Sequence, residues 1–327
     1  MKNKPILVTG GAGYIGSHVC KHLSLSGYMP VVIDNLSEGH ETAVKWGPLI
    51  KADVRDTATV TSVMKAYDTK SVMHFAASAY VGESVKDPIA YYDNNVTGMV
   101  SLLRSCRDAD VTGIILSSSC ATYGTPETVP ISEETPQHPV NPYGTTKLVC
   151  ERMLRDVETA HGIRYAALRY FNAAGADPEG ELSEKHAPET HVIPLALMAA
   201  AGQIDSFGIF GTDYPTADGS CIRDYIHVQD LARGHVAALA RLESGANSFA
   251  VNLGTGEGHS VLELVAGIEK LTGKPLPIRY ETRREGDPPI LIADPSQAST
   301  LLGFTAERSD LESIIRDAAP SFGVHVS

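Results

Sequence analysis

The stretch that decides the fold is ILVTGGAGYIGS, residues 6–17. Its first four residues, Ile6 to Thr9, are apolar or β-branched and predict a buried strand. Glycines follow at the spacing G-x-x-G-x-x-G, from Gly10 to Gly16. Glycine permits a tight turn, lets backbone N–H groups approach an anion, and lets the next helix pack close to the strand. The stretch therefore predicts a strand–turn–helix unit that binds a phosphate group.

Short β-branched runs alternate with amphipathic stretches through the first half of the chain. Further strands are expected at 31–34, 71–75, 113–117 and 168–171. This alternation predicts an α/β fold with a doubly wound parallel sheet of the Rossmann type. After about residue 172 the chain becomes rich in Gly, Pro and charge. We expect a first domain at 1–172 and a smaller C-terminal α/β substrate lobe at 173–327, with some segments returning to the first domain.

Asp34 identifies the phosphate-bearing ligand of the glycine loop. It ends the second expected strand, 18 residues after Gly16. A carboxylate at this place binds both ribose hydroxyls of an adenosine and repels a 2′-phosphate, so NAD is favoured over NADP. Asp53 follows the third strand and is expected either to meet the adenine amino group or to be an ordinary loop aspartate.

Tyr143 and Lys147 form the candidate catalytic pair. Asn141 and Pro142 predict a helix start, so the two side chains lie on one face, one turn apart. A free tyrosine titrates near pH ~10, and a cation beside it lowers its pKa. Ser119 follows the strand ending near Leu116, at the edge where such sheets bind ligands. Together they predict proton removal from a substrate hydroxyl.

Composition limits the classes of partner and the compartment. The 327-residue chain has a net charge of −12, which argues against nucleic acid or an anionic membrane as partner. Its five cysteines lack zinc-like spacing, and no signal peptide or membrane span is visible. We therefore expect a cytoplasmic protein with reduced thiols and no metal site. An anionic substrate would need its own Arg residues.

Several longer blocks carry a specific resemblance. They are His74-Phe75-Ala76-Ala77, Tyr91-Tyr92-Asp93-Asn94-Asn95-Val96, Arg169-Tyr170-Phe171-Asn172, Arg223-Asp224-Tyr225-Ile226-His227-Val228 and Arg283-Arg284-Glu285-Gly286-Asp287. With the elements above, they resemble the UDP-glucose 4-epimerase branch of the extended short-chain dehydrogenase/reductase family, over about residues 5–305. The resemblance implies an isomerase of galactose metabolism that inverts carbon 4 of UDP-hexoses reversibly, through a 4-keto intermediate, and acts as a homodimer.

The resemblance also implies a role for each matching residue. Tyr143 is the base, Lys147 tunes it and binds the nicotinamide ribose, and Ser119 holds the sugar hydroxyl. The residues expected to line NAD are Gly10, Gly13, Tyr14, Ile15, Gly16, Asp34, Asn35, Asp53, Val54, Phe75, Ala76, Ala77, Asn94, Tyr143, Lys147 and Phe171. Those expected to hold the nucleotide sugar are Ser119, Tyr143, Asn172, Arg223, Arg284 and Asp287.

Departures from the family pattern leave alternatives open. Leu291 stands where some members carry a tyrosine that restricts them to unacetylated sugars, so UDP-N-acetylglucosamine is an alternative substrate. A UDP-xylose/UDP-arabinose 4-epimerase uses the same chemistry and is a further alternative. His191 stands where an asparagine often contacts substrate, and its role stays open. Cys120 and Ala121 replace the Asp-Glu pair of nucleotide-sugar 4,6-dehydratases, which disfavours elimination. A non-catalytic NAD sensor would not need the whole set of catalytic and arginine residues.

Overall fold

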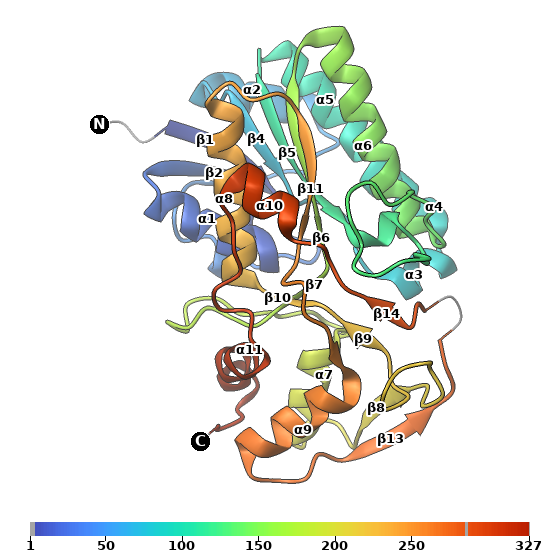
Figure 1. Cartoon of the computed structure of the whole chain (residues 1–327). Helices are drawn as coiled ribbons and strands as arrows, with labels where there is room; N and C mark the ends of the chain where they lie inside the picture. The colour runs from blue at the N-terminus through green and yellow to red at the C-terminus, as the bar shows by residue number, and fades with distance from the viewer. Residues whose placement is uncertain (1–3, 285–286, 327) are drawn as a thin grey trace.

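The computed structural model describes residues 4–284 and 287–326 as two lobes around the expected parallel sheet (Figure 1). The large sheet in these residues has seven strands in the order β11-β6-β5-β4-β1-β2-β3, and every neighbouring pair is parallel. Its strands are β1 Lys4–Thr9, β2 Tyr28–Asp34, β3 Leu49–Lys51, β4 Ser71–His74, β5 Gly113–Ser119, β6 Arg164–Tyr170 and β11 Phe249–Leu253. The expected doubly wound α/β fold is confirmed.

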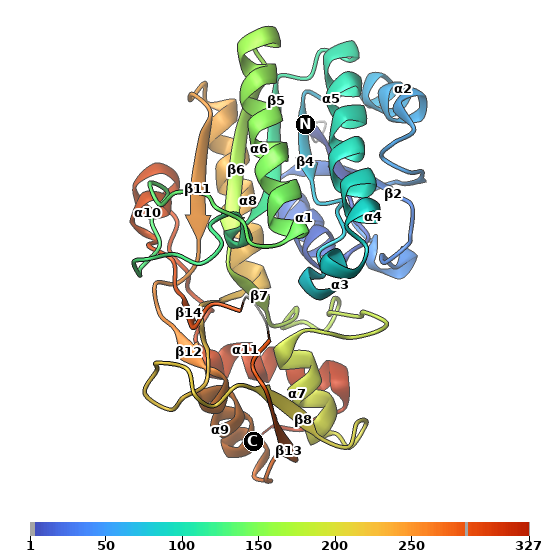
Figure 2. The same cartoon turned by 90° about the vertical axis from the view of Figure 1, so that its right-hand side faces the viewer.

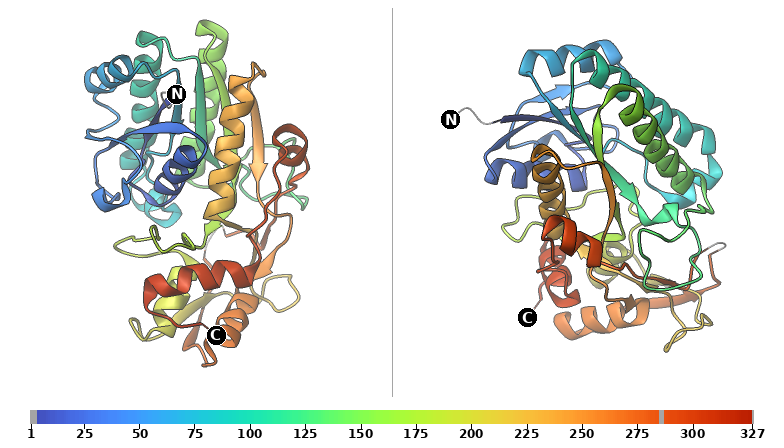
Figure 3. Two further views of the ribbon diagram at one scale, coloured as in Figure 1. Left: turned by 90° about the vertical axis from the view of Figure 1, so that its left-hand side faces the viewer. Right: turned by 45° about the horizontal axis from the view of Figure 1, so that its top comes forward.

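Helices cover both faces of this sheet. One face carries α1 and α8, which pack against each other (Figure 3), and the other carries α2, α5 and α6 (Figure 2). The helices are α1 Tyr14–Leu25, α2 Thr57–Tyr67, α3 Val81–Lys86, α4 Pro88–Tyr91, η2 Tyr92–Thr97, α5 Gly98–Asp108, α6 Pro142–His161, α8 Val228–Glu243 and α10 Ser296–Leu302. The strand order reverses between β1 and β4, and ligands of such sheets bind at this switch point.

The second lobe is built from small sheets and helices below the large sheet in Figure 1. Its elements are β7 Asn172–Ala174, α7 Val192–Ala200, β8 Phe207–Phe210, β9 Ile222–Arg223, β10 Tyr225–His227, β12 His259–Ser260, α9 Val261–Thr272, β13 Ile278–Glu281, β14 Ile290–Leu291 and α11 Leu311–Ala318. Between them, α8, β11 and α10 return to the large sheet. Because these elements return, the chain does not divide cleanly at residue 172, and a domain boundary there stays a proposal.

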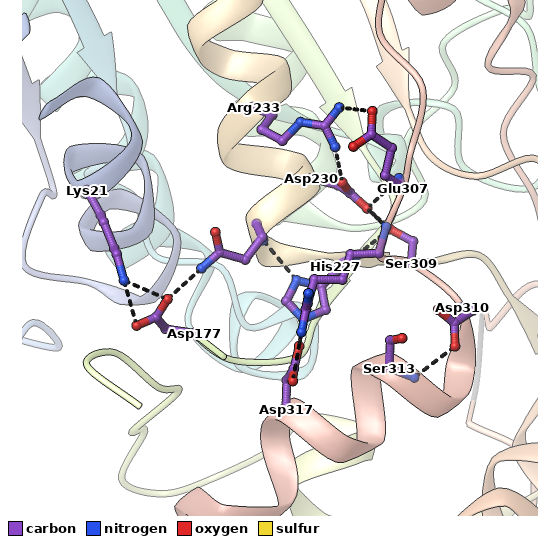
Figure 4. A network of polar contacts seen from close by, with 12 residues as sticks. Lys21, Asp177, His227, Asp230, Arg233, Glu307, Ser309, Asp310, Ser313 and Asp317 are labelled. Carbon is purple, nitrogen blue, oxygen red and sulfur yellow. Dashed lines mark hydrogen bonds and ion pairs between the residues drawn. The ribbon is translucent and has the colours of Figure 1, made fainter. Parts of the chain in front are cut away.

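A polar network ties the two lobes together (Figure 4). Lys21 of α1 binds the buried Asp177, and Gln229 of α8 donates to the same carboxylate. His227 contacts Asp317 of α11. Buried charges need such partners, since an unpaired one costs several kcal/mol. These contacts fix the positions of α1, α8 and α11 around the segment that follows β7.

His227 caps α8, which begins at Val228, and Asp230 lies in the first turn of the helix. The Asp230 carboxylate accepts hydrogen bonds from Ser309 Oγ and from the backbone N–H groups of Glu307 and Arg308.

Within the described residues, no helix combines the length and the apolar character that crossing a membrane requires.

Candidate active site

The glycine loop lies at the switch point, between the ends of β1 and β4. Gly10 has φ +73°, and a Cβ there would come 2.5 Å from Ala76 N; a Cβ at Gly16 would come 2.2 Å from Gly10 O. These contacts require glycine at both places. Gly13 caps α1 without a side-chain hydrogen bond, and the first turn has no acidic residue. The first N–H groups of α1 thus fit an anionic pyrophosphate.

Asp34 fastens this loop to the end of β2. Its Oδ2 accepts the Ala12 N–H at 2.9 Å and its Oδ1 accepts the Leu36 N–H at 2.8 Å. Each carboxylate oxygen keeps a second lone pair with which to accept a ribose hydroxyl. Asn35 donates to Asp53, which also binds Arg55. Arg55 holds the pKa of Asp53 well below its usual range, so this carboxylate already has a structural partner.

Tyr143 and Lys147 lie one turn apart at the start of α6, as their spacing predicts. Asn141 caps the helix by accepting the Gly144 N–H at 2.8 Å. Both side chains are buried, with Tyr143 7% and Lys147 4% exposed. The Lys147 Nζ lies 5.9 Å from the centre of the Tyr143 ring and donates to the Ser117 carbonyl at 2.7 Å.

Burial dominates the titration of this pair. It raises the pKa of Tyr143 well above its usual range, and a hydrogen bond to Ser119 opposes the shift. Burial lowers the pKa of Lys147 to about 8. The net shift of Tyr143 is therefore opposite to the expected lowering by Lys147. A desolvated phenol needs more positive charge nearby to ionise than one lysine provides.

Strand β5 positions Ser119 next to Tyr143. Side chains alternate along a strand, so Ser117 and Ser119 share one face, and Ser118 on the other donates to Glu151 at 2.5 Å. Glu151 is paired with Arg169, and both side chains are buried. This pair joins α6 to β6 and so sets the place of the α6 start. Cys120 is buried just after Ser119.

The other residues expected at the cofactor surround the same strand ends. Phe75, Ala76 and Ala77 follow β4 and are partly buried, and the Phe75 ring contacts His235 at 4.9 Å between centres. Val54 belongs to the core on the α5 face. Phe171 is buried beside Cys120, and Ile15 packs on the core.

Tyr14 is partly buried, and its hydroxyl donates to the Gly175 carbonyl at 2.7 Å, which ties α1 to the second lobe.

Asn94 lies in η2, a π-helical turn of the kind often found at functional sites. It donates to Ser78 Oγ at 3.1 Å. The neighbouring Asn95 is buried, donates to Thr146 of α6 and accepts the Ser78 N–H. Asn95 thus links the loop after β4 to the catalytic helix. It was missed as a site residue, because only the fold shows that this amide points inward.

The expected substrate residues come from separate elements of the second lobe. Arg223 is 8% exposed and pairs with Asp287 rather than with the adjacent Asp224. The Arg284 guanidinium lies 4.0 Å from the centre of the Phe210 ring. Glu285 and Gly286 of this block lie outside the described residues. Asn172 starts β7 and hydrogen-bonds to Asp224 through its backbone.

Two buried hydroxyls beside Arg223 mark further candidates. Tyr214 and Tyr225 are 5% and 1% exposed, and their hydroxyls have no hydrogen-bond partner among the described residues. Both interact electrostatically with Arg223. Tyr225 stands in the same block as Arg223, which is the signal that could have identified it. A buried polar group without a partner is costly, so these hydroxyls fit a polar ligand.

The Gly254–Gly258 loop has a structural role. The Thr255 and Gly256 N–H groups donate to the buried Asp224 carboxylate, which also accepts the Ala293 N–H.

His191, at the start of α7, has two acidic partners. Its Nδ1 contacts Glu184 and Glu189; burial lowers its pKa, but these contacts outweigh that and raise it to about 10.

The site combines a dinucleotide loop, a buried tyrosine–lysine–serine set and the buried Arg223, which together define an NAD-dependent short-chain dehydrogenase/reductase. Residues 6–254 match the model of the NAD dependent epimerase/dehydratase family. The chain belongs to this family.

Known relatives match over nearly the whole chain. A UDP-glucose 4-epimerase of Rhizobium meliloti (strain 1021) is 52% identical over 97% of both chains. The structure of UDP-glucose 4-epimerase from Brucella ovis in complex with NAD is 56% identical and covers 99% of this chain and 100% of its own, with a TM-score of 0.97. A UDP-glucose-4-epimerase from Stenotrophomonas maltophila, with bound NAD and formylated UDP-arabinopyranose, is 40% identical over 98% of both chains, with a TM-score of 0.95.

Proposed function

We propose that the protein is an NAD-dependent isomerase that interconverts UDP-galactose and UDP-glucose by inverting carbon 4 of the sugar. The observation that carries this proposal is the buried Tyr143, with Lys147 and Ser119 beside it, at the strand ends that also carry the glycine loop. The likeness to NAD-bound UDP-glucose 4-epimerases over the full chain supports it. The second lobe supplies Arg223, a permanently charged donor suited to a diphosphate.

The residues of the chain move a proton and hold the substrate. Tyr143 takes the proton of the sugar 4-hydroxyl, directly or through Ser119, and later returns it to the inverted centre. NAD, held by the glycine loop and Asp34, would accept and return the hydride, and its positive charge would favour the tyrosine phenolate. Lys147, held by the Ser117 carbonyl, adds a second positive charge. Arg223 and Arg284 anchor the nucleotide while the 4-keto sugar turns.

The residues after Ser119 disfavour the dehydratase alternative. Elimination of water needs an acid and a base there, whereas Cys120 is buried and burial raises the pKa of its thiol to about 12. Ala121 has no titratable group. The substrate is therefore oxidised and reduced again at the same carbon.

The test is incubation of the purified chain with UDP-galactose and no added nicotinamide. Formation of UDP-glucose, followed by NMR, is the expected result, because NAD is regenerated in each cycle. Release of a 4-keto-6-deoxy sugar would support the dehydratase instead. Absence of turnover over a panel that includes UDP-N-acetylgalactosamine and UDP-xylose would support a sensor.

A homodimer is part of the proposal. Val81, Val85, Ile89 and Tyr92 form an exposed apolar stripe along α3, α4 and η2; Ile89 is 79% exposed. Because α3 and α4 pack beside α6, a second copy covering the stripe would also brace the catalytic helix. Ile89→Asp should yield a monomer by analytical ultracentrifugation, while Leu25→Asp, 73% exposed on α1, should stay dimeric.

We also place the protein in the cytoplasm. All five cysteines lie within the described residues and are buried and unpaired. Proteins of oxidising compartments use such residues as disulfides.

A further inference from the structure

Two histidines and two glutamates converge in the segment between β7 and α7. They are Glu184, His186, Glu189 and His191, and are called the His–Glu cluster below. One nitrogen or oxygen atom of each lies within 4.8 Å of the others. The glutamate side chains are buried, at 6% and 5% exposure, whereas the side chains of His186 and His191 are 16% and 40% exposed. Four potential metal ligands therefore meet in a partly closed place.

The spacing of the ligand atoms fits a tetrahedral ion. The Nδ1 atom of His191 lies 2.8 Å from Glu184 Oε1 and 2.9 Å from Glu189 Oε1. The Nδ1 atom of His186 lies 3.1 Å from the same Glu184 oxygen and 3.9 Å from Glu189 Oε2. Bonds of 2.0–2.1 Å around tetrahedral zinc place neighbouring ligand atoms about 3.3 Å apart. Three of the observed distances lie about 0.2–0.5 Å below that value and the fourth lies about 0.6 Å above it, so the ligands would shift slightly to surround an ion.

Pairwise hydrogen bonding explains this arrangement less well. An imidazole Nδ1–H carries one proton and donates along one direction. Here each Nδ1 faces two carboxylates, and Glu184 Oε1 faces both imidazoles. The four groups thus share their contacts instead of forming two separate pairs. A dication bound among them would also neutralise the two buried carboxylates.

Neighbouring groups orient the ligands. Glu189 Oε1 accepts the backbone N–H groups of Thr190 at 2.7 Å and His191 at 2.8 Å. The Tyr80 ring, at the start of α3, lies 5.7 Å from the His186 ring and 5.8 Å from the His191 ring, between centres. Such outer contacts fix ligand orientation and commonly decide metal affinity.

We propose that the His–Glu cluster binds a divalent transition metal, with zinc as the ion that its mixed nitrogen and oxygen ligands fit best. Four protein ligands fill the coordination shell, which is the pattern of a structural rather than a catalytic site. The metal would fasten residues 184–191 where the chain passes between the lobes (Figure 2). His186 lines a cavity of ≈ 40 Å³ together with Gly13 and Tyr14, so the site adjoins the glycine loop.

The test measures metal content on the untagged full-length chain. The protein is stripped with a chelator, equilibrated with zinc, passed through a desalting column and analysed by mass spectrometry of the metal. We expect about one zinc per chain, and binding at least about tenfold weaker for His186→Ala and for Glu189→Gln. The matched control is Glu179→Gln with Glu181→Gln, an acidic pair in the same segment that already binds Lys21; it should keep wild-type zinc.

Cobalt provides a second readout of geometry. Cobalt in the wild-type chain should give the intense visible absorption of a four-coordinate site, and His186→Ala should lose it. Zinc should also raise the melting temperature of wild type but not of the variant, because a ligand that binds the folded state stabilises it. Zinc-free wild type after desalting, or equal zinc binding by wild type and His186→Ala, would overturn the proposal. None of these readouts depends on epimerase turnover, so they are independent of the proposed function.

Discussion

The two sides of the candidate site are held in different ways. On the large-sheet side, Gly10, Asp34, Ser119 and Tyr143 stand at strand ends and helix starts, and backbone contacts hold the glycine loop, Asp34 and the α6 start. On the second-lobe side, Arg223 and Arg284 are held by side chains, Asp287 and the Phe210 ring. The first side is thus set by local geometry and the second by long-range packing. Substitutions should separate chemistry from substrate binding along this division.

The largest effect is expected for Tyr143→Phe on the large-sheet side. Removing the hydroxyl removes the acid–base group, which is worth about 10²–10⁴-fold in turnover. Bound NAD, read from the absorbance of the denatured protein, should be unchanged. The control is Tyr165→Phe, at the opposite end of the sheet on β6. Near-wild-type turnover of Tyr143→Phe would exclude it as the base.

Arg223→Gln should affect binding rather than chemistry. Loss of charge-assisted hydrogen bonds to a diphosphate costs about 1.5–3 kcal/mol, or roughly 10–100-fold in KM. The value of kcat should change much less. Arg279→Gln is the matched control, because this arginine is exposed in the same lobe and pairs with Glu281. If kcat instead fell by this factor while KM stayed unchanged, Arg223 would act in the chemical step and not in substrate binding.

Acid should destabilise the large-sheet lobe through its buried histidines. Burial lowers the pKa of His18 and His235 to about 4 and of His74 to about 3. The unfolded chain, whose histidines titrate near 6.5, then binds more protons than the folded chain below that pH, so stability falls from about pH 6.5 down to pH 4.

Each of these histidines contributes about 2 kcal/mol to the loss at pH 5. In urea titrations at pH 7 and pH 5, His235→Gln should reduce the pH-dependent loss by about that amount. His161→Gln, at the exposed end of α6, should not. An unchanged loss in the His235 variant would show that other groups govern acid unfolding.

The smallest effect is expected for Leu291→Tyr, at the position that we propose borders the sugar. Leu291 packs against Cys120 and Phe171 at the border of the two lobes. A larger ring there should lower turnover of UDP-N-acetylgalactosamine about tenfold relative to UDP-galactose, since pocket fit of this kind is worth about 1–3 kcal/mol. Equal losses for both sugars would instead indicate a general disturbance of the cluster.

The features that could be predicted from the sequence were those that local backbone conformation fixes. The glycine loop, Asp34 and the Tyr143 helix start follow from turn and capping rules that act within a few residues. The alternation of strands and helices predicted the doubly wound sheet. In contrast, the pKa direction of Tyr143 was wrong, because burial is a property of the packed fold. The pairing of Arg223 with Asp287, 64 residues away, likewise depends on the packed fold.

The sequence alone therefore determined the class of fold, the glycine loop and the placing of the candidate pair Tyr143 and Lys147, because each depends on short-range spacing. Tertiary structure decided the return of β11 to the large sheet, the pairing across the second lobe and the meeting of the His–Glu cluster. In that cluster the spacing Glu184-x-His186-x-x-Glu189-x-His191 was visible in the chain, but it matches neither a helix nor a strand period. Only the folded segment brings the four side chains to one point, because long-range contacts fix its path between the lobes.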